Sequence, residues 1–156
     1  MDIHEVADDI LRRCENSHFS EAADLYVALS LGRLFWPETR LANGSVFLAL
    51  NVGDAEEIDR RIAAWSEAGE MTWSQFVDSS NTFEVRYLFA NWPGNSEVVE
   101  EAELRLAQFL LEAWAAKLRS DFPDRGFSVE LDGNTASDGP CILVRQTCTD
   151  LVWQSE

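Results

Sequence analysis

Two pairs of side chains near the N-terminus have a spacing that could support chemistry. His4 and Asp8 stand four residues apart, so on a helix they share one face and could hold a metal or act as an acid–base pair. Cys14 and His18 have the same spacing and could form a thiol nucleophile with its base. Histidine ligands normally come with further His or Cys partners, and this chain has two His and three Cys. We therefore expect a solvated acidic helix face, with no metal site and no catalytic residue.

Other catalytic signatures are also weak in this sequence. Gly133 and Gly139 flank a polar loop, but a phosphate cradle would lead into a helix N-terminus, and here a strand is expected to follow. No Gly-x-Ser-x-Gly motif occurs. With 28 acidic residues, some carboxylate pair always exists, so a glycosidase-type pair is not informative. We expect a protein that is not an enzyme and uses no cofactor; a small carboxylate- or metal-dependent enzyme is the alternative of another class.

Charge is the strongest positive clue. The chain has 28 acidic and 12 basic residues, which gives a net charge of −16 and a pI near 4.3. The net charge is −5 over residues 1–24, −4 over each of 54–70, 97–112 and 121–138, and +1 over 25–53. A field of this sign repels phosphate backbones and anionic lipids, so we expect no nucleic-acid or membrane binding. It favours a basic protein partner, although it also serves plain solubility.

The candidate partner-binding residues are carboxylates in two runs at predicted helix starts and on two predicted strands. They are Asp54, Glu56, Glu57 and Asp59 in the first run, Glu97, Glu100, Glu101 and Glu103 in the second, and Glu84 and Glu130 on the strands. The helix dipole stabilises carboxylates in the first turns of a helix, so the two runs also have a purely structural explanation. As docking residues they would pair with Lys and Arg of a partner.

The six tryptophans divide into two groups. Trp65 and Trp114 lie on apolar stripes of predicted helices, which indicates core positions. The other four lie near element ends, and Trp is favoured at binding hot spots, so they are candidate anchors: Trp36, Trp73, Trp92 and Trp153.

The N-terminal half is predicted to be mostly helical. A first helix is expected over residues 2–16, and Ser20 can cap a second that ends just before Pro37, where a backbone donor is missing. Asn43-Gly44 predicts a turn, and we interpret the apolar run 46–50 as a short strand.

Two helix-capping signatures follow in the middle of the chain. Asp54, with Glu57 three residues later, predicts the start of a helix that Gly69 ends. Thr72 to Gln75 repeats the pattern and predicts a short helical turn over residues 73–79.

The C-terminal half is predicted to hold a small sheet and one long helix. Alternation of apolar and polar residues predicts a strand over 83–91. Ser96 caps a helix over residues 97–119 that is apolar around most of its circumference, which is typical of a central packing element. Strands over 127–131 and 141–147, joined by a polar loop, predict an antiparallel hairpin.

Together these elements predict one α+β domain over residues 1–156. Its N-terminal half is helical, and a small, mostly antiparallel sheet of three or four strands packs on the long central helix. A chain of 156 residues with 46% apolar residues has enough material for one core.

The expected location is the cytoplasm. The N-terminus lacks a basic region followed by an apolar run, and no stretch of about 18 apolar residues occurs, so we expect neither a secretory signal nor a membrane span. The three cysteines are read as free thiols, with Cys141 as a small core hydrophobe.

Small size, an acidic surface and the lack of catalytic signatures look like the features of cytoplasmic bacterial immunity proteins and antitoxins. The likeness is one of size and charge, not of particular residues. It implies an inhibitor that neutralises a basic partner protein. An acidic, dimeric secretion chaperone has the same size and charge and would expose an apolar groove, so it stays open as an alternative.

Overall fold

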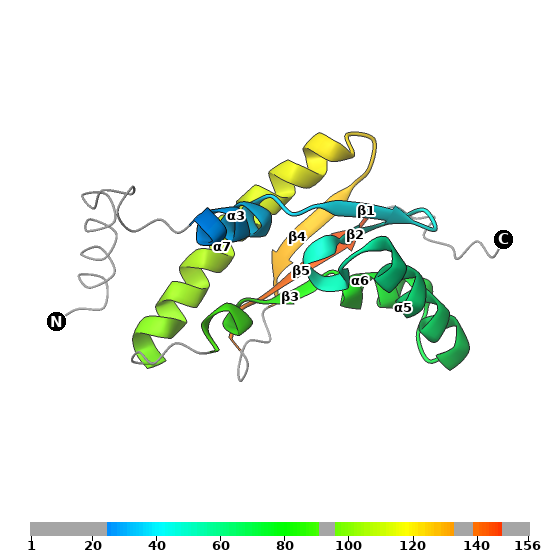
Figure 1. The fold of residues 1–156 in the computed structure, drawn as a ribbon, viewed down its shortest axis with the longest axis horizontal. Coiled ribbons are helices and arrows are strands. Elements are labelled where there is room, and N and C mark those ends of the chain that lie inside the picture. Colours follow the sequence, from blue (N-terminus) through cyan, green and yellow to red (C-terminus); the bar gives the residue numbers. More distant parts are fainter. Residues whose placement is uncertain (1–24, 91–95, 133–138, 148–156) are drawn as a thin grey trace.

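The computed structural model describes residues 25–90, 96–132 and 139–147 (Figure 1). The predicted helix over 2–16, His4, Asp8, Cys14, His18, Trp92 and Trp153 lie outside the described residues. In chain order the elements are α3 (Leu25–Phe35), β1 (Thr39–Ala42), β2 (Ser45–Leu48), α4 (Ala49–Val52), α5 (Ala55–Ala68), α6 (Trp73–Ser80), β3 (Thr82–Glu84), the 3-10 helix η1 (Val85–Phe89), α7 (Ser96–Asp121), β4 (Phe127–Leu131) and β5 (Cys141–Gln146). This confirms the predicted α+β class, with small antiparallel sheets packed against a long helix.

The strands form two antiparallel sheets. β1 and β2 are a hairpin, and the second sheet has the order β3-β5-β4. The predicted turn at Asn43-Gly44 joins β1 to β2, and both residues have positive φ angles, 47° and 76°. Such angles are typical of the tight turns that match the twist of a hairpin, and Asn and Gly adopt them most readily.

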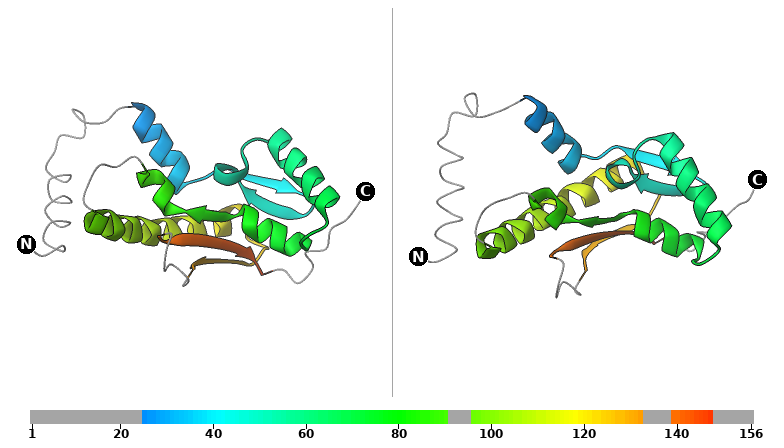
Figure 2. Two further views of the ribbon diagram at one scale, coloured as in Figure 1. Left: turned by 90° about the horizontal axis from the view of Figure 1, so that it is seen from below. Right: turned by 60° about the horizontal axis from the view of Figure 1, so that its bottom comes forward.

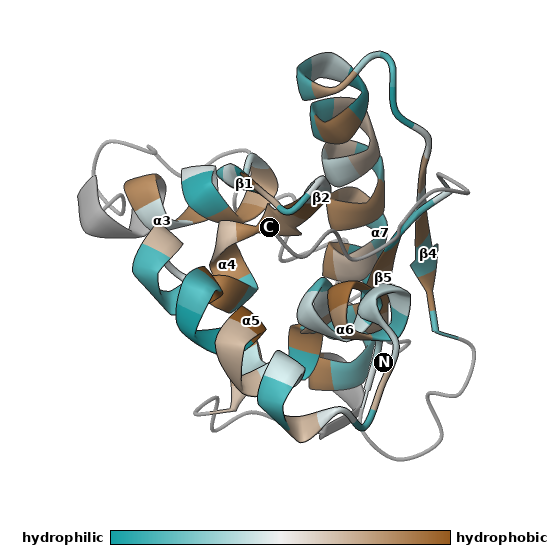
Figure 3. Cartoon of the chain, turned by 90° about the vertical axis from the view of Figure 1, so that its right-hand side faces the viewer, coloured by the Kyte–Doolittle hydropathy of each residue, from teal (hydrophilic) through white to brown (hydrophobic). Residues whose placement is uncertain are grey.

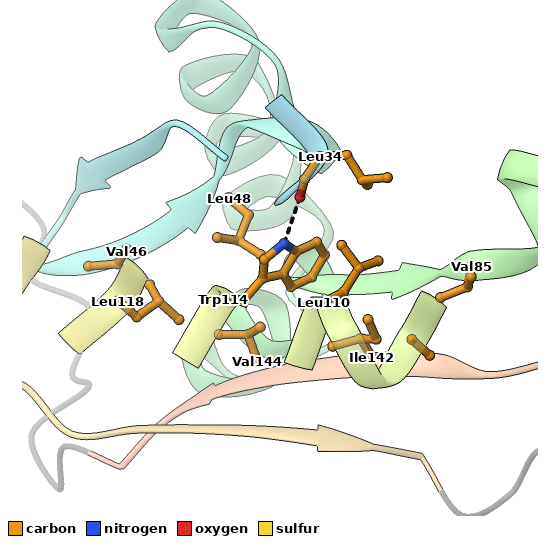
Figure 4. Close-up of a cluster of buried hydrophobic side chains, with 10 residues drawn as sticks. Leu34, Val46, Leu48, Val85, Leu110, Trp114, Leu118, Ile142 and Val144 are labelled. Atoms are coloured by element: carbon orange, nitrogen blue, oxygen red, sulfur yellow. Dashed lines mark hydrogen bonds between the residues drawn. The ribbon is translucent and has the colours of Figure 1, made fainter. Parts of the chain in front are cut away.

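The larger core lies between α7, the three-stranded sheet, α3 and β2 (Figure 4). The face of α7 that carries Leu110, Trp114 and Leu118 is fully buried against Ile142 and Val144 of β5, among others. The indole Nε1 of Trp114 donates a hydrogen bond of 2.8 Å to the Leu34 carbonyl oxygen, which joins α3 to α7. The prediction that Trp114 belongs to the core is confirmed.

A second core lies beneath α5 and α6. It contains the side chains of Phe47, Val52, Ile58, Ile62, Trp73 and Val77, with Trp65 and Phe76 packed against them. The indole of Trp73 donates to the hydroxyl of Ser45 at 2.9 Å, so its polar group is satisfied inside the core. Trp73 is therefore a buried core residue and not a surface anchor.

The predicted capping residues of α5 and α6 act as expected. The Asp54 carboxylate accepts from the Glu57 backbone N–H at 2.9 Å, and Gly69 ends α5 in the left-handed conformation with φ 63°. At α6, Thr72 and Gln75 form a complete reciprocal capping box.

The predicted strand over 83–91 is only partly correct. β3 ends at Glu84, opposite Cys141, and residues 85–89 form the 3-10 helix η1. The next residue of the partner strand would be Pro140, which has no N–H to donate to a ladder, although its carbonyl accepts from Val85 N at 3.1 Å. Pairing therefore stops there, and Tyr87 is 71% exposed. Similarly, the run 46–50 is a strand only to Leu48, because α4 begins at Ala49.

Candidate functional site

The carboxylates of the first predicted run lie on or just before α5. Asp54 caps the helix, and Glu57 contacts two arginines of its own helix, with 2.7 Å to Arg60 Nη2 and 3.0 Å to Arg61 Nε. Glu56 and Asp59 are exposed. Asp54 and Glu57 of this run therefore already have partners within the protein.

The second run lies at the start of α7. Glu101 forms an ion pair with Arg105 at 2.7 Å, one turn along the helix, while Glu100 is exposed. Glu103 is only 1% exposed, and its Oε1 lies 3.6 Å from Nε of Arg86 in η1. The structure thus places Glu103 inside the protein, where a docking partner does not reach it. The side chain of Glu97 lies outside the described residues.

The structure brings the two predicted strand residues, Glu84 and Glu130, onto one face of the three-stranded sheet. Inward-facing residues of β5 alternate with outward-facing ones, and the register places Glu84 opposite Cys141 and Glu130 opposite Leu143. We call the outward side the outer sheet face. Its residues are Thr82, Glu84, Ser128, Glu130, Asp132, Cys141, Leu143 and Arg145. Figure 2 shows α3, α5 and the β1–β2 hairpin on the opposite side, and no described helix covers the outer sheet face.

Two carboxylates lie near one arginine of this face. Nη1 of Arg145 is 3.8 Å from the Glu130 carboxylate, and its Nε is 3.9 Å from the carboxylate of Asp78, in α6. The Ser128 hydroxyl also donates to Glu130. Partial burial raises the pKa of Asp78, and the positive charge of Arg145 opposes that effect. Glu84 and Asp132 lie farther along the same face, beside Cys141. With these two added, the surface has four carboxylates and one guanidinium, and so carries a net negative charge.

Cys141 occupies the outer sheet face between Glu84 and Asp132. It was expected in the core, but the strand alternation turns Ile142 inward instead and leaves Cys141 half-buried. Burial raises the pKa of the Cys141 thiol, and the charges of Glu84 and Asp132 raise it further. Because the thiolate is disfavoured, Cys141 lacks the environment of an activated nucleophile.

Sequence reasoning missed three charged residues on or beside this surface. Asp132 lies two residues after Glu130, so the period of a strand would have placed it on the same face. Arg145 could have been found in the same way on β5. Asp78 had no such signal, because only the packing of α6 beside β5 brings it to Arg145.

Trp36 is the one candidate anchor that the described residues leave at the surface. Its side chain is about half-exposed, and Nζ of Lys117 lies 5.5 Å from the centre of its ring. This cation–π contact links the end of α3 to α7. It lies on the opposite side of the sheet from the outer sheet face.

Metal-binding groups and a surface hollow are the remaining features of the described residues that bear on chemistry. Within residues 25–90, 96–132 and 139–147, no group of three or more His, Cys, Asp and Glu is arranged to hold a metal ion. A surface hollow near α4 is lined by residues of both charges, including Arg33, Glu38, Arg40 and Asp54, and Glu38 and Arg40 pair with each other at 2.8 Å.

None of the helices in the described part of the chain is both long and apolar enough to cross a bilayer. Comparisons with protein-family models, with curated proteins and with solved structures found no match to this chain.

Proposed function

We propose that this protein is a cytoplasmic protein-binding module, an inhibitor of the immunity or antitoxin type, that neutralises a basic partner through its outer sheet face. One observation supports the proposal above all. Glu84, Glu130 and Asp132 share a sheet face that no described helix covers, which holds one arginine and has Asp78 of α6 beside it.

A sheet is a suitable base for such a surface. Cross-strand neighbours have fixed spacing, so the carboxylates keep their relative positions without a large loss of side-chain freedom on binding. The net charge of −16 surrounds this surface with a field that attracts a cation. We expect electrostatics to act mainly on the rate of association and on the choice of partner, and less on the lifetime of the complex.

A dimeric secretion chaperone is the second candidate function. It is favoured by exposed apolar side chains on two helices, Leu29 and Leu31 of α3 and Phe109 of α7. Size-exclusion chromatography with light scattering separates the two candidates. The chaperone hypothesis predicts a dimer, and the inhibitor hypothesis does not require one.

The test of the proposed function is a pull-down from a lysate of the source cells with a matched pair of variants. Glu84→Gln with Glu130→Gln removes two charges from the outer sheet face, and Glu56→Gln with Asp59→Asn removes two exposed charges from α5. We expect the wild type and the α5 variant to retain one stoichiometric basic partner, while the sheet variant loses it at moderate salt. With the purified partner, the sheet variant should associate about tenfold more slowly at low salt.

Two outcomes would contradict the proposal. One is equal retention by all three proteins, and the other is an association rate that does not depend on salt. Equal unfolding midpoints of the three proteins are the control for folding.

A further inference from the structure

β4 is an edge strand of the described sheet, and on one side its backbone groups have no partner among the described residues. The sheet order is β3-β5-β4, and the N–H of Asp132 donates to the Cys141 carbonyl at 2.8 Å. In an antiparallel pair, bonded positions alternate with non-bonded ones, so the even-numbered residues of 126–132 face β5. The N–H and C=O groups of the three odd-numbered residues point away from the sheet. In the described part of the chain no hydrogen bond is made to the outward groups of Phe127, Val129 and Leu131.

The opposite edge of the sheet is different. β3 is three residues long, and the Thr82 carbonyl, which points outward there, accepts a hydrogen bond of 2.9 Å from the side chain of Asn51. That edge is short and partly covered, which is how natural sheets avoid unwanted pairing. β4 is longer and lacks such a cover among the described residues.

The inward face of β4 is also incompletely covered. Val129 lies directly opposite Val144, and Leu131 opposite Ile142, so each pair shares the same side of the sheet. Val144 and Ile142 are buried, whereas Val129 and Leu131 are only half-buried. β5 has a strand on both sides and β4 on one, which explains the difference. A further strand beside β4 would cover these apolar side chains.

We infer that the free edge of β4 receives an extended segment of the basic partner, which adds a fourth strand to the sheet. This inference rests on the proposed function and specifies how the partner binds. By the strand register, the apolar residues of β4 lie on the inward face, while Ser128 and Glu130 lie on the outward face. Figure 3 colours β4 by the hydropathy of its residues. The added segment therefore alternates apolar residues, which pack beside Val129 and Leu131, with Lys or Arg, which lie beside Glu130.

Charge distinguishes this occupant from a second copy of the chain. Two β4 strands paired edge to edge would bring two acidic outer sheet faces together, each in a molecule of net charge −16. Like charges across a strand pair are destabilising, whereas a basic segment would neutralise Glu130.

The first test uses a capped seven-residue peptide of alternating Lys and Val, followed by amide hydrogen exchange of the full chain. We expect slower exchange at the amides of Phe127, Val129 and Leu131. Two versions of the peptide, N-methylated at the lysines or at the valines, separate edge pairing from charge attraction. Only one of the two sets of amides faces β4 in a paired strand, so one version cannot pair, while both keep the same charge. An alternating Glu and Val peptide controls for charge. Equal binding of both methylated peptides, or protection elsewhere only, would overturn the inference.

The second test uses the partner obtained by pull-down. Val129→Pro removes an outward N–H without breaking a bond between β4 and β5, and Val129→Ala keeps that N–H. We expect the proline variant to lose the partner and the alanine variant to retain it. If the proline variant retains the partner while the outer-face charge variant loses it, the edge inference fails and the proposed function stands. If both retain it, both fail.

Two further results would assign the edge to another occupant and overturn the inference. One is a dimer in sedimentation that Val129→Pro converts to a monomer. The other is protection of the three amides in the free protein that disappears on truncation after Thr147. The peptide experiment needs no variant, so it still decides the matter if the proline variant does not fold.

Discussion

At the scale of single residues, Glu103 is a buried carboxylate on α7. Its side chain is 1% exposed, and neither oxygen accepts a hydrogen bond from the residues that the structure describes. Arg86 lies 3.6 Å away, so Coulomb attraction offsets part of the desolvation of the charge. Gly139 lies against the same carboxylate with φ 79°, and a Cβ there would come within 2.8 Å of Glu103 Oε2. Glycine is therefore required at this position by both space and backbone conformation.

Removing Arg86 should leave Glu103 as a buried charge without its nearest cation. We expect Arg86→Met to lower the free energy of unfolding by about 2 kcal/mol, less than for a fully buried pair because Arg86 is half-exposed. Adding Glu103→Met should restore at least half of the loss, since the buried charge is then gone. Urea unfolding followed by tryptophan fluorescence measures all three variants. Strictly additive effects of the two substitutions would contradict the coupling.

At the scale of elements, two side-chain amides join the hairpin to the rest of the fold. On the side of β2 away from β1, the Asn81 amide accepts from Leu48 N at 2.9 Å and donates to the Val46 carbonyl at 2.8 Å. The Gln146 amide of β5 accepts from Val46 N at 3.1 Å and donates to the same carbonyl at 3.2 Å. All these groups are buried, so the amides take the place of a neighbouring strand.

Loss of either amide should therefore lower the free energy of unfolding and loosen the attachment of the hairpin. We expect Asn81→Ala and Gln146→Ala each to cost about 2–3 kcal/mol, because buried backbone groups of β2 lose their partners. The matched control is Gln108→Ala, an exposed amide on α7, which should change stability by less than about 0.5 kcal/mol. Hydrogen exchange gives a local readout: the Leu48 amide should exchange faster in Asn81→Ala and the Val46 amide in Gln146→Ala. Unchanged exchange at both amides would contradict this role.

At the scale of the whole molecule, the excess negative charge is spread over several surfaces. Within the described residues, α5, the start of α7 and the outer sheet face all carry exposed carboxylates, and several arginines already pair with acids on their own helix. Repulsion among the remaining charges opposes the compact state, although it also keeps molecules apart from one another.

Added salt should therefore stabilise this protein. We expect the melting temperature to rise by several degrees between 20 mM and 300 mM sodium chloride, because screening weakens repulsion between exposed like charges. Glu56→Gln with Asp59→Asn should show a smaller rise. A melting temperature that falls with salt would mean that the ion pairs of α5 and α7 outweigh the repulsion.

Local patterns were enough to predict most of the elements. Asp54 and Gly69 bound α5, Thr72 begins α6, and the alternation of apolar residues marks β4 and β5, because caps and periodicity act within a few residues. The same patterns placed Glu84 and Glu130 on strands, but did not indicate that the two share a face.

Contacts between distant segments decided the rest. Pro140 ends the pairing of β3, the fold buries Glu103 against η1, and α6 brings Asp78 to Arg145. Composition and short-range spacing determined by themselves that this protein is an acidic α+β chain, and they located most of its described helices and strands, but not β1, α4 or η1. Tertiary structure decided which carboxylates are buried, which share a face and which strand edge has no partner among the described residues, because each depends on partners far away in sequence.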